Sequence, residues 1–305
     1  LKDSERDDSV PVASSSAVLL HDWASCLDPD RLPARIKALV ARSGASFEQR
    51  DGIWQVATES GSQAIGTLVQ QAIAETLVPY RPRLETVSET RVLVPALTSP
   101  AARARLHSIL TALDLPDCRV IDSAEAVVRA ARVKAAPVIA TVWISAFEAR
   151  VTLIRASGSE SWSLFGDGYR DCDRRLRRHA SFELLRAHGI DIEDDPFLGD
   201  ALRDQLEELR RTNQPEALWS VSVAGASVTM PAEIRRELLL NSSERIGISI
   251  EEHLSGEIPV EPFPLVVAAS EPLWIGLTET LEERLHCTPV LVQEDDWTRL
   301  LEVSS

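Results

Sequence analysis

The sequence predicts an α/β protein of two lobes, in which mixed or parallel sheets are covered by helices. The chain has 305 residues and is 44% hydrophobic, so it can bury a sizeable core, and its length favours two lobes over one compact unit. Short apolar runs alternate with longer segments of helical periodicity along most of the chain. This β-α-β-α alternation is typical of sheets flanked by helices.

The first half alternates expected strands with expected helices. Residues 52–57 (GIWQVA) alternate apolar and polar side chains, as a half-buried strand does. Thr98, Ser99 and Pro100 have the chemistry of a helix start, because a first-turn proline needs no backbone N–H. The expected strands are residues 52–57, 91–95 and 118–121, and the expected helices are residues 32–42, 62–78, 100–113 and 124–133.

The second half opens on a predicted hairpin. Residues 137–143 and 149–155 are apolar runs joined by a short turn, and residues 161–165 follow as a third strand. A long helix over residues 171–188 is expected to end at Gly189, which suits a left-handed cap. The remaining expected elements are helices 202–211, 232–254 (with a break near 242–247) and 277–285, and strands 218–223, 227–230, 265–269 and 289–292.

Charge and cysteine content narrow the possible partners. A formal net charge of −15 repels nucleic acid phosphates and anionic lipid head groups, so we expect neither as a partner. The basic run at residues 169–179 is expected to be a solvated helix face, because its arginines wrap around the helix among acids. No stretch nears the roughly 20 apolar residues of a membrane span, and no cysteines stand at CxxC or zinc spacing. We expect a cytoplasmic protein with buried free thiols, no bound metal and no membrane insertion.

Four strings, taken in order, carry a resemblance to a known family. They are residues 92–103 (VLVPALTSPAAR), 119–132 (RVIDSAEAVVRAAR), 168–176 (GYRDCDRRL) and 228–237 (VTMPAEIRRE). Their order and spacing resemble the actin-like nucleotide-binding domain of the seventy-kilodalton heat-shock chaperone family. The resemblance implies an actin-like ATPase fold of the ribonuclease H-like type, with two lobes that each hold a mixed sheet flanked by helices.

The resemblance also implies where the lobes lie and places an ATP cleft between them. The first lobe would span residues 1–133 (upper part about 24–90, lower part about 91–133), and the second lobe residues 134–305 (lower part about 134–182 and 255–305, upper part about 183–254).

The family's contacts to the triphosphate are missing from the expected hairpin. The family has an Asp, three glycines and a Thr there, because only glycine backbone folds against a triphosphate and points its N–H groups inward. The corresponding positions are Trp143, Ser145, Ala146, Phe147 and Glu148. Side chains fill the space that glycines would leave. Glu148 also adds a negative charge next to the triphosphate. One such like-charge contact at ~4 Å costs about 4 kcal/mol at an effective dielectric near 20, which offsets several hydrogen bonds of about 1 kcal/mol each.

The contacts to adenosine and magnesium are replaced as well. The Gly-Gly-Ser-Thr-Arg turn that holds adenosine falls on residues 270–274 (SEPLW), which contain no glycine. Magnesium requires carboxylates or the waters they hold, but two of the family's acidic positions fall on Trp143 and Ser123. A third falls on Leu164, or on Asp167 if the gap is placed differently. The degenerate nucleotide-site positions are Ser123, Trp143, Ser145, Ala146, Phe147, Glu148, Leu164, Gly168, Ser270, Glu271 and Trp274.

One catalytic candidate is retained. Lys37 aligns with the lysine that the family points at the attacking water and the γ-phosphate. An ordinary solvent-facing helix lysine explains it better, because the other catalytic positions are replaced. The family's first phosphate loop, Asp-Leu-Gly-Thr-Thr, does not occur in residues 1–20.

Two functions of different classes follow. The favoured one is a pseudo-ATPase that acts as a protein-binding or scaffold module, with no cofactor and with protein partners of unknown identity. The alternative is an ATP-binding chaperone or actin-like ATPase, with Mg²⁺, whose first phosphate loop lies upstream of residue 1. The hairpin at residues 145–148 favours the first, since an upstream loop does not restore its glycines. A sugar or acid kinase of the same superfamily needs the same loops and ranks last.

The large side chains at the replaced positions predict a filled cleft. We expect Trp143, Phe147, Leu164, Leu273 and Trp274 to converge, because packing recovers roughly 1.5 to 3 kcal/mol per buried apolar side chain. The two lobes would then be held together permanently. The competing expectation is that these residues belong to the separate cores of the lobes.

Overall fold

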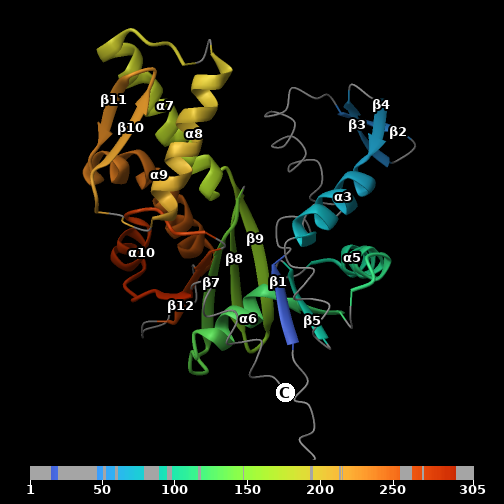
Figure 1. Ribbon diagram of the computed structural model, residues 1–305. Helices are drawn as coiled ribbons and strands as arrows, with labels where there is room; N and C mark the ends of the chain where they lie inside the picture. The colour runs from blue at the N-terminus through green and yellow to red at the C-terminus, as the bar shows by residue number, and fades with distance from the viewer. Residues whose placement is uncertain are drawn as a thin grey trace, which may run out of the picture.

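A mixed α/β fold is seen in the computed structural model (Figure 1). The structure describes residues 15–19, 47–50, 53–58, 61–78, 89–94, 98–115, 118–146, 148–192, 195–212, 214, 216–254, 263–269 and 271–292. A five-stranded mixed sheet with its helices makes up the second half, and a parallel and an antiparallel sheet of three described strands each lie in the first half. The predicted α/β class is confirmed.

The largest sheet is built around the predicted hairpin. Strands β7 (Val138–Ile144), β8 (Glu148–Arg155) and β9 (Gly158–Phe165) follow one another through short turns, each antiparallel to the next. Strand β12 (Leu265–Ala269) pairs with β7 in parallel, and β13 (Val290–Val292) pairs with β12 in parallel. The strand order is β13-β12-β7-β8-β9, so β8 alone runs against the other four.

The two faces of this sheet belong to two different apolar clusters. Successive side chains of a strand point to opposite faces, so the wholly buried β7 and β12 need cover on both sides. The first cluster takes Val138, Ala140, Val142 and Ile144 from β7. The second cluster takes Trp143 from the same strand.

Helices and a small hairpin complete the first cluster. They are α7 (Tyr169–His188), α8 (Pro196–Arg211), α9 (Ala232–Leu254) and α10 (Leu277–Leu285), with β10 (Trp219–Val223) and β11 (Ala226–Met230) paired antiparallel. Helix α7 ends as predicted at Gly189, which has φ 67°. Asp195 caps α8 through its side chain, which accepts hydrogen bonds from the N–H groups of Phe197 and Leu198.

Helix α9 is continuous, so the predicted break near residues 242–247 is wrong. Ser242, Ser243 and Gly247, which have weak helix propensity, are all buried. The Oγ of Ser242 donates to Asp167, and a Cβ added at Gly247 would lie 2.6 Å from the Cδ of Arg284. Small residues occur here because Asp167 and Arg284 approach the helix closely. The packing against these neighbours outweighs the weak helix propensity of the small residues.

The first half contains a parallel sheet in the order β1-β5-β6. Its strands are β1 (Ser15–Leu19), β5 (Glu89–Val94) and β6 (Cys118–Asp122), and its described helices are α5 (Pro100–Ala112) and α6 (Ser123–Ala130). Ser99 caps α5, since its Oγ accepts a hydrogen bond from the N–H of Ala102 at 3.2 Å. The helix start predicted there is confirmed.

A second small sheet was only partly predicted. Its strands are β2 (Phe47–Arg50), β3 (Ile53–Thr58) and β4 (Gly61–Ala64), followed by helix α3 (Ile65–Leu77). Strand β3 was expected, but β1, β2 and β4 were not, and the helix expected from residue 62 begins later because β4 takes its first residues. The helix expected at residues 32–42 lies outside the described residues.

Helix α6 lies between the two main sheets (Figure 1) and contacts β5 and β6 on one side and β7 and β12 on the other. The second cluster forms around it. This cluster comprises Leu93 of β5, Ala126 and Val127 of α6, Trp143 of β7, Val266 and Ala268 of β12, and Val292 of β13. The two halves of the chain therefore share one apolar core at α6.

Two further expectations concern helix length and cysteines. Within the described ranges, none of the helices has the length and apolar character that crossing a bilayer requires.

Cys118, Cys172 and Cys287 are free, and the last two are buried. Burial raises the pKa of the Cys172 thiol and raises that of Cys287 to about 11, so neither is a ready nucleophile.

Candidate functional site

The turn between β7 and β8, to which the resemblance assigns the triphosphate, is closed by its own backbone. The N–H of Ser145 donates to the carbonyl of Glu148 at 2.9 Å. The N–H groups of Tyr169 and Arg170, in the first turn of α7, donate to the carbonyls of Ser145 and Ala146, both at 3.0 Å. Gly168 precedes this helix as its N-cap. These helix N–H groups, which could otherwise bind an anion, are used within the protein.

A buried ion pair lies at the start of β8, directly after this turn. Glu148 and Arg150 are 0% and 1% exposed, and Arg150 donates to Glu148 at 3.0 Å. Arg150 stands opposite Trp143 in the β7–β8 register, so the pair lies on the sheet face of the second cluster. Two charges at this depth are retained only as partners, because an isolated buried charge costs several kcal/mol.

The residues predicted to fill the cleft do not all meet. Leu164 and Leu273 are partly buried against the first cluster, and Trp274 belongs to that cluster. Trp143 lies on the opposite sheet face with α6. The prediction that these side chains converge is wrong for Trp143, because its place in β7 directs it away from the face that Trp274 covers.

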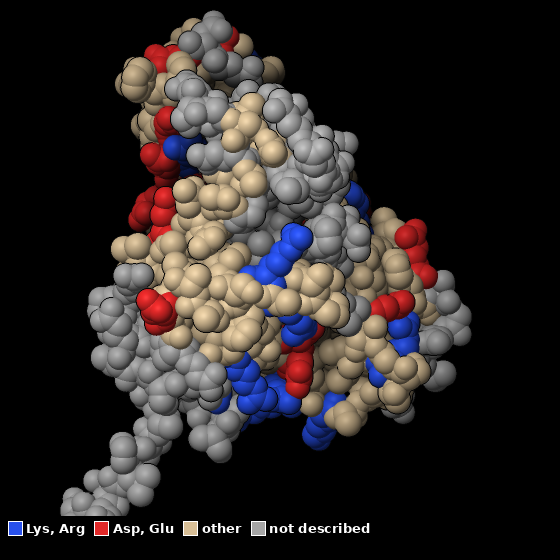
Figure 2. All heavy atoms as spheres, turned by 90° about the vertical axis from the view of Figure 1, so that its right-hand side faces the viewer, with Lys and Arg blue, Asp and Glu red and all other residues tan. Residues whose placement is uncertain are grey.

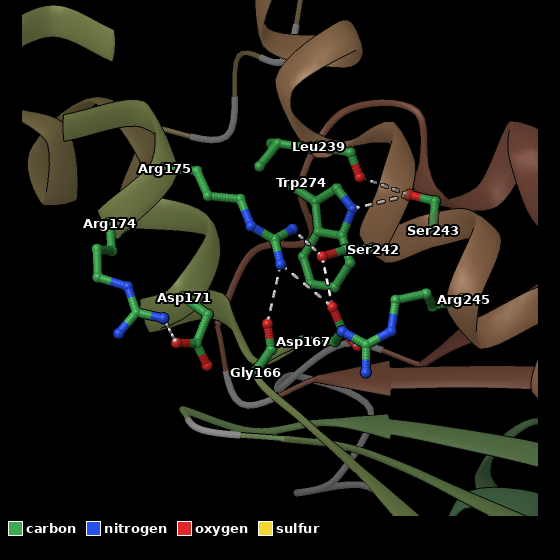
Figure 3. Close-up of polar contacts among 10 residues, drawn as sticks. All are labelled: Gly166, Asp167, Asp171, Arg174, Arg175, Leu239, Ser242, Ser243, Arg245 and Trp274. Carbon is green, nitrogen blue, oxygen red and sulfur yellow. Dashed lines mark hydrogen bonds and ion pairs between the residues drawn. The ribbon is translucent and has the colours of Figure 1, made fainter. Parts of the chain in front are cut away.

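Trp274 and Asp167 are both held by serines of α9 (Figure 3). The indole Nε1 of Trp274 donates to the Oγ of Ser243 at 3.0 Å. Fully buried Asp167 accepts a hydrogen bond from the Oγ of Ser242 at 2.7 Å and pairs with Arg245 at 3.1 Å. Arg175 approaches the same carboxylate from α7 at 3.4 Å. Asp167 thus joins the start of α7 to α9: its Oδ1 accepts the hydrogen bond of Ser242, and its Oδ2 lies in the ion pair with Arg245.

A small cavity of about 30 Å³ lies between α7, α8, α9 and the segment that links β12 to α10. Its wall contains buried Arg210, which donates through Nε to Asp173 at 3.2 Å and through a terminal nitrogen to Glu271 at 3.0 Å. The guanidinium also lies over the ring of Tyr169, 4.8 Å from its centre. Arg210 therefore joins α8, α7 and the segment after β12.

Burial shapes the electrostatics of this cavity. It raises the pKa of Asp173 from 3.8 to about 6, although the adjacent Arg210 acts in the opposite direction. The nearby carboxylates of Glu207 and Glu271 raise it further. Burial also lowers the pKa of Arg235, whose guanidinium lies 4.2 Å from the centre of the Trp219 ring.

The sequence offered one signal for these buried charges that was not used. Arg210 follows Leu202 and Leu206 at four-residue spacing on the buried side of α8. Asp173 likewise lies on the buried side of α7, three residues before Leu176. A charged residue in phase with the apolar stripe of a helix is paired or functional, since unpaired charges are rarely buried.

No protein-family model matches this chain, and a search of curated proteins finds no match either.

The positions assigned to the degenerate nucleotide site occupy several separate places. Ser145, Ala146 and Gly168 meet at the start of α7, with Glu148 at the foot of the same turn. The other described positions are Ser123 at the start of α6, Trp143 beside that helix, Leu164 on β9, and Glu271 and Trp274 after β12. Lys37, Phe147 and Ser270 lie outside the described residues.

The donor set does not fit the Mg²⁺ that the resemblance implies. Ser123, Trp143 and Leu164 supply no carboxylate, and the carboxylate of Asp167 is bound by Ser242 and two arginines. Across the part of the chain that the structure describes, no group of three or more His, Cys, Asp or Glu side chains could hold a metal ion. The arrangement provides packing, charge pairing and a closed turn.

Proposed function

We propose that this chain is a pseudo-ATPase with the actin-like fold of the heat-shock chaperone family, which acts by binding other proteins and does not hydrolyse ATP. Two features support the actin-like part of the proposal. The second half has a mixed sheet with helices on it, and helix α6 joins it to a second sheet in the first half. Three of the strings that carry the resemblance begin on β5, β6 and β11, and the fourth begins one residue before α7.

The buried pair of Glu148 and Arg150 carries the proposal that ATP is not used. A triphosphate needs backbone N–H groups and positive charge directed toward it. At the corresponding turn the chain instead has a fully buried carboxylate, and Arg150 is already bound to it. Admitting phosphate here would require breaking a buried ion pair, which costs about 3 to 5 kcal/mol.

The segment assigned to adenosine supports the same conclusion. Trp274 fills space in the first cluster, and Glu271 is bound by Arg210. The cavity beside them, of about 30 Å³, is far smaller than the roughly 300 Å³ or more of pockets for drug-sized ligands. A nucleotide would have to displace Trp274 to enter.

Thermal unfolding with nucleotide tests the proposal. We expect the melting temperature of the purified chain to be the same with and without millimolar ATP and Mg²⁺. A ligand present at 100 times its dissociation constant would stabilise the protein by about 2.7 kcal/mol, which such an experiment resolves. A saturable rise in melting temperature, or measurable ATP turnover, would favour the alternative of an ATP-binding chaperone or actin-like ATPase.

A further inference from the structure

Helix α7 carries a basic and apolar surface on its outward side, which we call the α7 strip. The strip consists of seven residues that are all exposed to solvent: Arg170, Arg174, Arg177, Arg178, Phe182, Leu185 and Arg186. The opposite side of the helix packs into the first cluster through Cys172, Leu176, Ala180 and Leu184. At 3.6 residues per turn, the strip residues fall on one half of the helix surface and the packed residues on the other.

The strip is positive in a strongly negative protein. Besides the buried Asp173, helix α7 has two acids, Asp171 and Glu183, which pair with Arg174 and Arg186 of the strip's five arginines. Arg174 points away from the Asp167 network, whereas its neighbour Arg175 points into it (Figure 3). No acid among the described residues pairs with Arg177 or Arg178. The whole chain, by contrast, has a formal charge of −15.

Two large apolar side chains extend the strip toward the end of α7. Phe182 is 59% exposed and Leu185 is 47% exposed, and they lie three residues apart on the same helix face. Neighbouring exposed apolar side chains beside charged ones are typical of a surface that binds a partner. Arg170 and Arg186 are 16 positions apart, so the strip is about 24 Å long at 1.5 Å per residue.

We propose that the α7 strip binds an acidic, amphipathic segment of another protein. Carboxylates of the partner would pair with Arg177 and Arg178, and its apolar side chains would cover Phe182 and Leu185. This inference rests on the proposed protein-binding function and names the chemistry of the partner. A helical segment of about four turns matches the length of the strip.

The width of the strip favours a protein segment over a membrane or a nucleic acid. Helix α8 packs beside α7 and exposes Asp200, Asp204 and Glu208 to solvent. These carboxylates would repel an anionic membrane that approached both helices. A single peptide helix is narrow enough to lie on α7 alone.

Peptide display tests the inference. The immobilised chain is used to select from a library of random 16-residue peptides, and the best peptides are measured by fluorescence anisotropy. We expect enriched peptides to be rich in Asp and Glu, with Leu or Phe spaced three or four residues apart. Raising NaCl from 50 to 300 mM should weaken binding, because exposed charge pairs are screened. Enriched peptides without acidic residues would overturn the inference.

Paired variants locate the binding surface. Arg177→Glu with Arg178→Glu, and separately Phe182→Ser with Leu185→Ser, should each raise the dissociation constant about tenfold or more. The control, Arg105→Glu with Arg119→Glu, changes exposed arginines of α5 and β6 and should leave it within about twofold. Melting curves check that every variant is folded.

Two other outcomes separate the inference from the proposed function. Acidic peptides that bind the Arg177/Arg178 variant as tightly as the unmodified chain would overturn the inference, while protein binding at another surface would stand. Vesicles of phosphatidylserine and phosphatidylcholine, and a 20-nucleotide single strand of DNA, serve as further probes. Tighter binding of either probe than of the peptides, lost in the Arg177/Arg178 variant, would assign the strip to a membrane or nucleic acid and overturn the inference.

Discussion

Trp143 and Trp274 are both buried, yet they lie in separate apolar clusters on opposite faces of the five-stranded sheet. Trp274 is held by Ser243 of α9, within the core of the second half. Trp143 packs with α6, where the two halves of the chain meet. The halves are therefore joined at α6 by Trp143 and its neighbours, and Trp143 and Trp274 do not form a shared plug.

The position of Trp143 predicts a large effect of truncation. Trp143→Ala should lower the free energy of unfolding by about 3 to 5 kcal/mol, because it leaves a cavity between the sheet and α6. Urea unfolding measures the change. Phe197→Ala, at a side chain that is 85% exposed, is the control and should stay within about 0.5 kcal/mol. A cost below about 1 kcal/mol for Trp143→Ala would contradict the assignment of this residue to a shared core.

The Glu148–Arg150 pair predicts strong non-additivity. Glu148→Leu or Arg150→Met alone should each destabilise by about 3 to 5 kcal/mol, because each leaves one buried charge without this partner. The double variant should cost less than the sum of the two, since no charge is then left behind. A double-mutant cycle by urea unfolding gives the coupling energy. Additive effects would show that the two side chains act independently.

Asp173 predicts a pH-dependent stability that its amide variant lacks. Because the pKa of Asp173 is raised from 3.8 to about 6 in the folded chain, the folded state binds this proton more tightly than the unfolded state. Protonated Asp173 therefore contributes to the free energy of unfolding in full below pH 3.8, and this contribution is lost as pH rises through about 6. Asp173→Asn should remove this dependence, so its stability relative to the unmodified chain should rise by on the order of 2 to 3 kcal/mol between pH 4 and 7.

Urea unfolding at half-unit steps from pH 4 to 7 checks the Asp173 prediction. A difference between the two proteins that stays constant over this range would show that Asp173 titrates at its ordinary pKa. A difference that falls as pH rises would show the opposite shift, with Arg210 dominating over burial.

Removing the Ser242 hydroxyl should lower the stability of the protein moderately, because this hydroxyl binds the carboxylate of Asp167. Ser242→Ala removes the hydroxyl donor to fully buried Asp167 and should cost about 1 to 3 kcal/mol, the range for leaving a buried polar group short of a partner. Ser108→Ala is the matched control, because its hydroxyl is exposed on α5 and bonds only a helix carbonyl. That variant should change stability by less than about 0.5 kcal/mol. Equal effects of the two substitutions would contradict a structural role for the Asp167 network.

Basic side chains of the first half also lie close to acids. On the face formed by the first half, positive and negative side chains lie close together near the lower edge (Figure 2). In the same half of the chain, Arg103 pairs with Asp122, and Arg129 with Glu125. Arg105 and Arg119, which are exposed on α5 and β6, serve as controls because they lie outside the α7 strip.

The sequence by itself determined most of the elements and the fold class. The period-two and period-3.6 patterns placed β7, β8, β9, β12, α5, α7 and α10 within a few residues of their bounds. Local chemistry was sufficient there, as in the cap at Ser99 and the left-handed Gly189. Short polar strands such as β2 and β4 were not predicted, because they lack an alternating apolar pattern.

Tertiary structure alone decided which buried side chains meet. The sequence identified Trp143 and Trp274 as apolar, but the side-chain alternation of β7 and the position of α6 assigned them to different cores. Likewise, Ser242 and Gly247 suggested a helix break until the approach of Asp167 and Arg284 explained them. Local propensities are worth at most about 1 kcal/mol per residue, whereas close packing and buried polar pairs between distant segments are worth several, so the distant contacts prevailed.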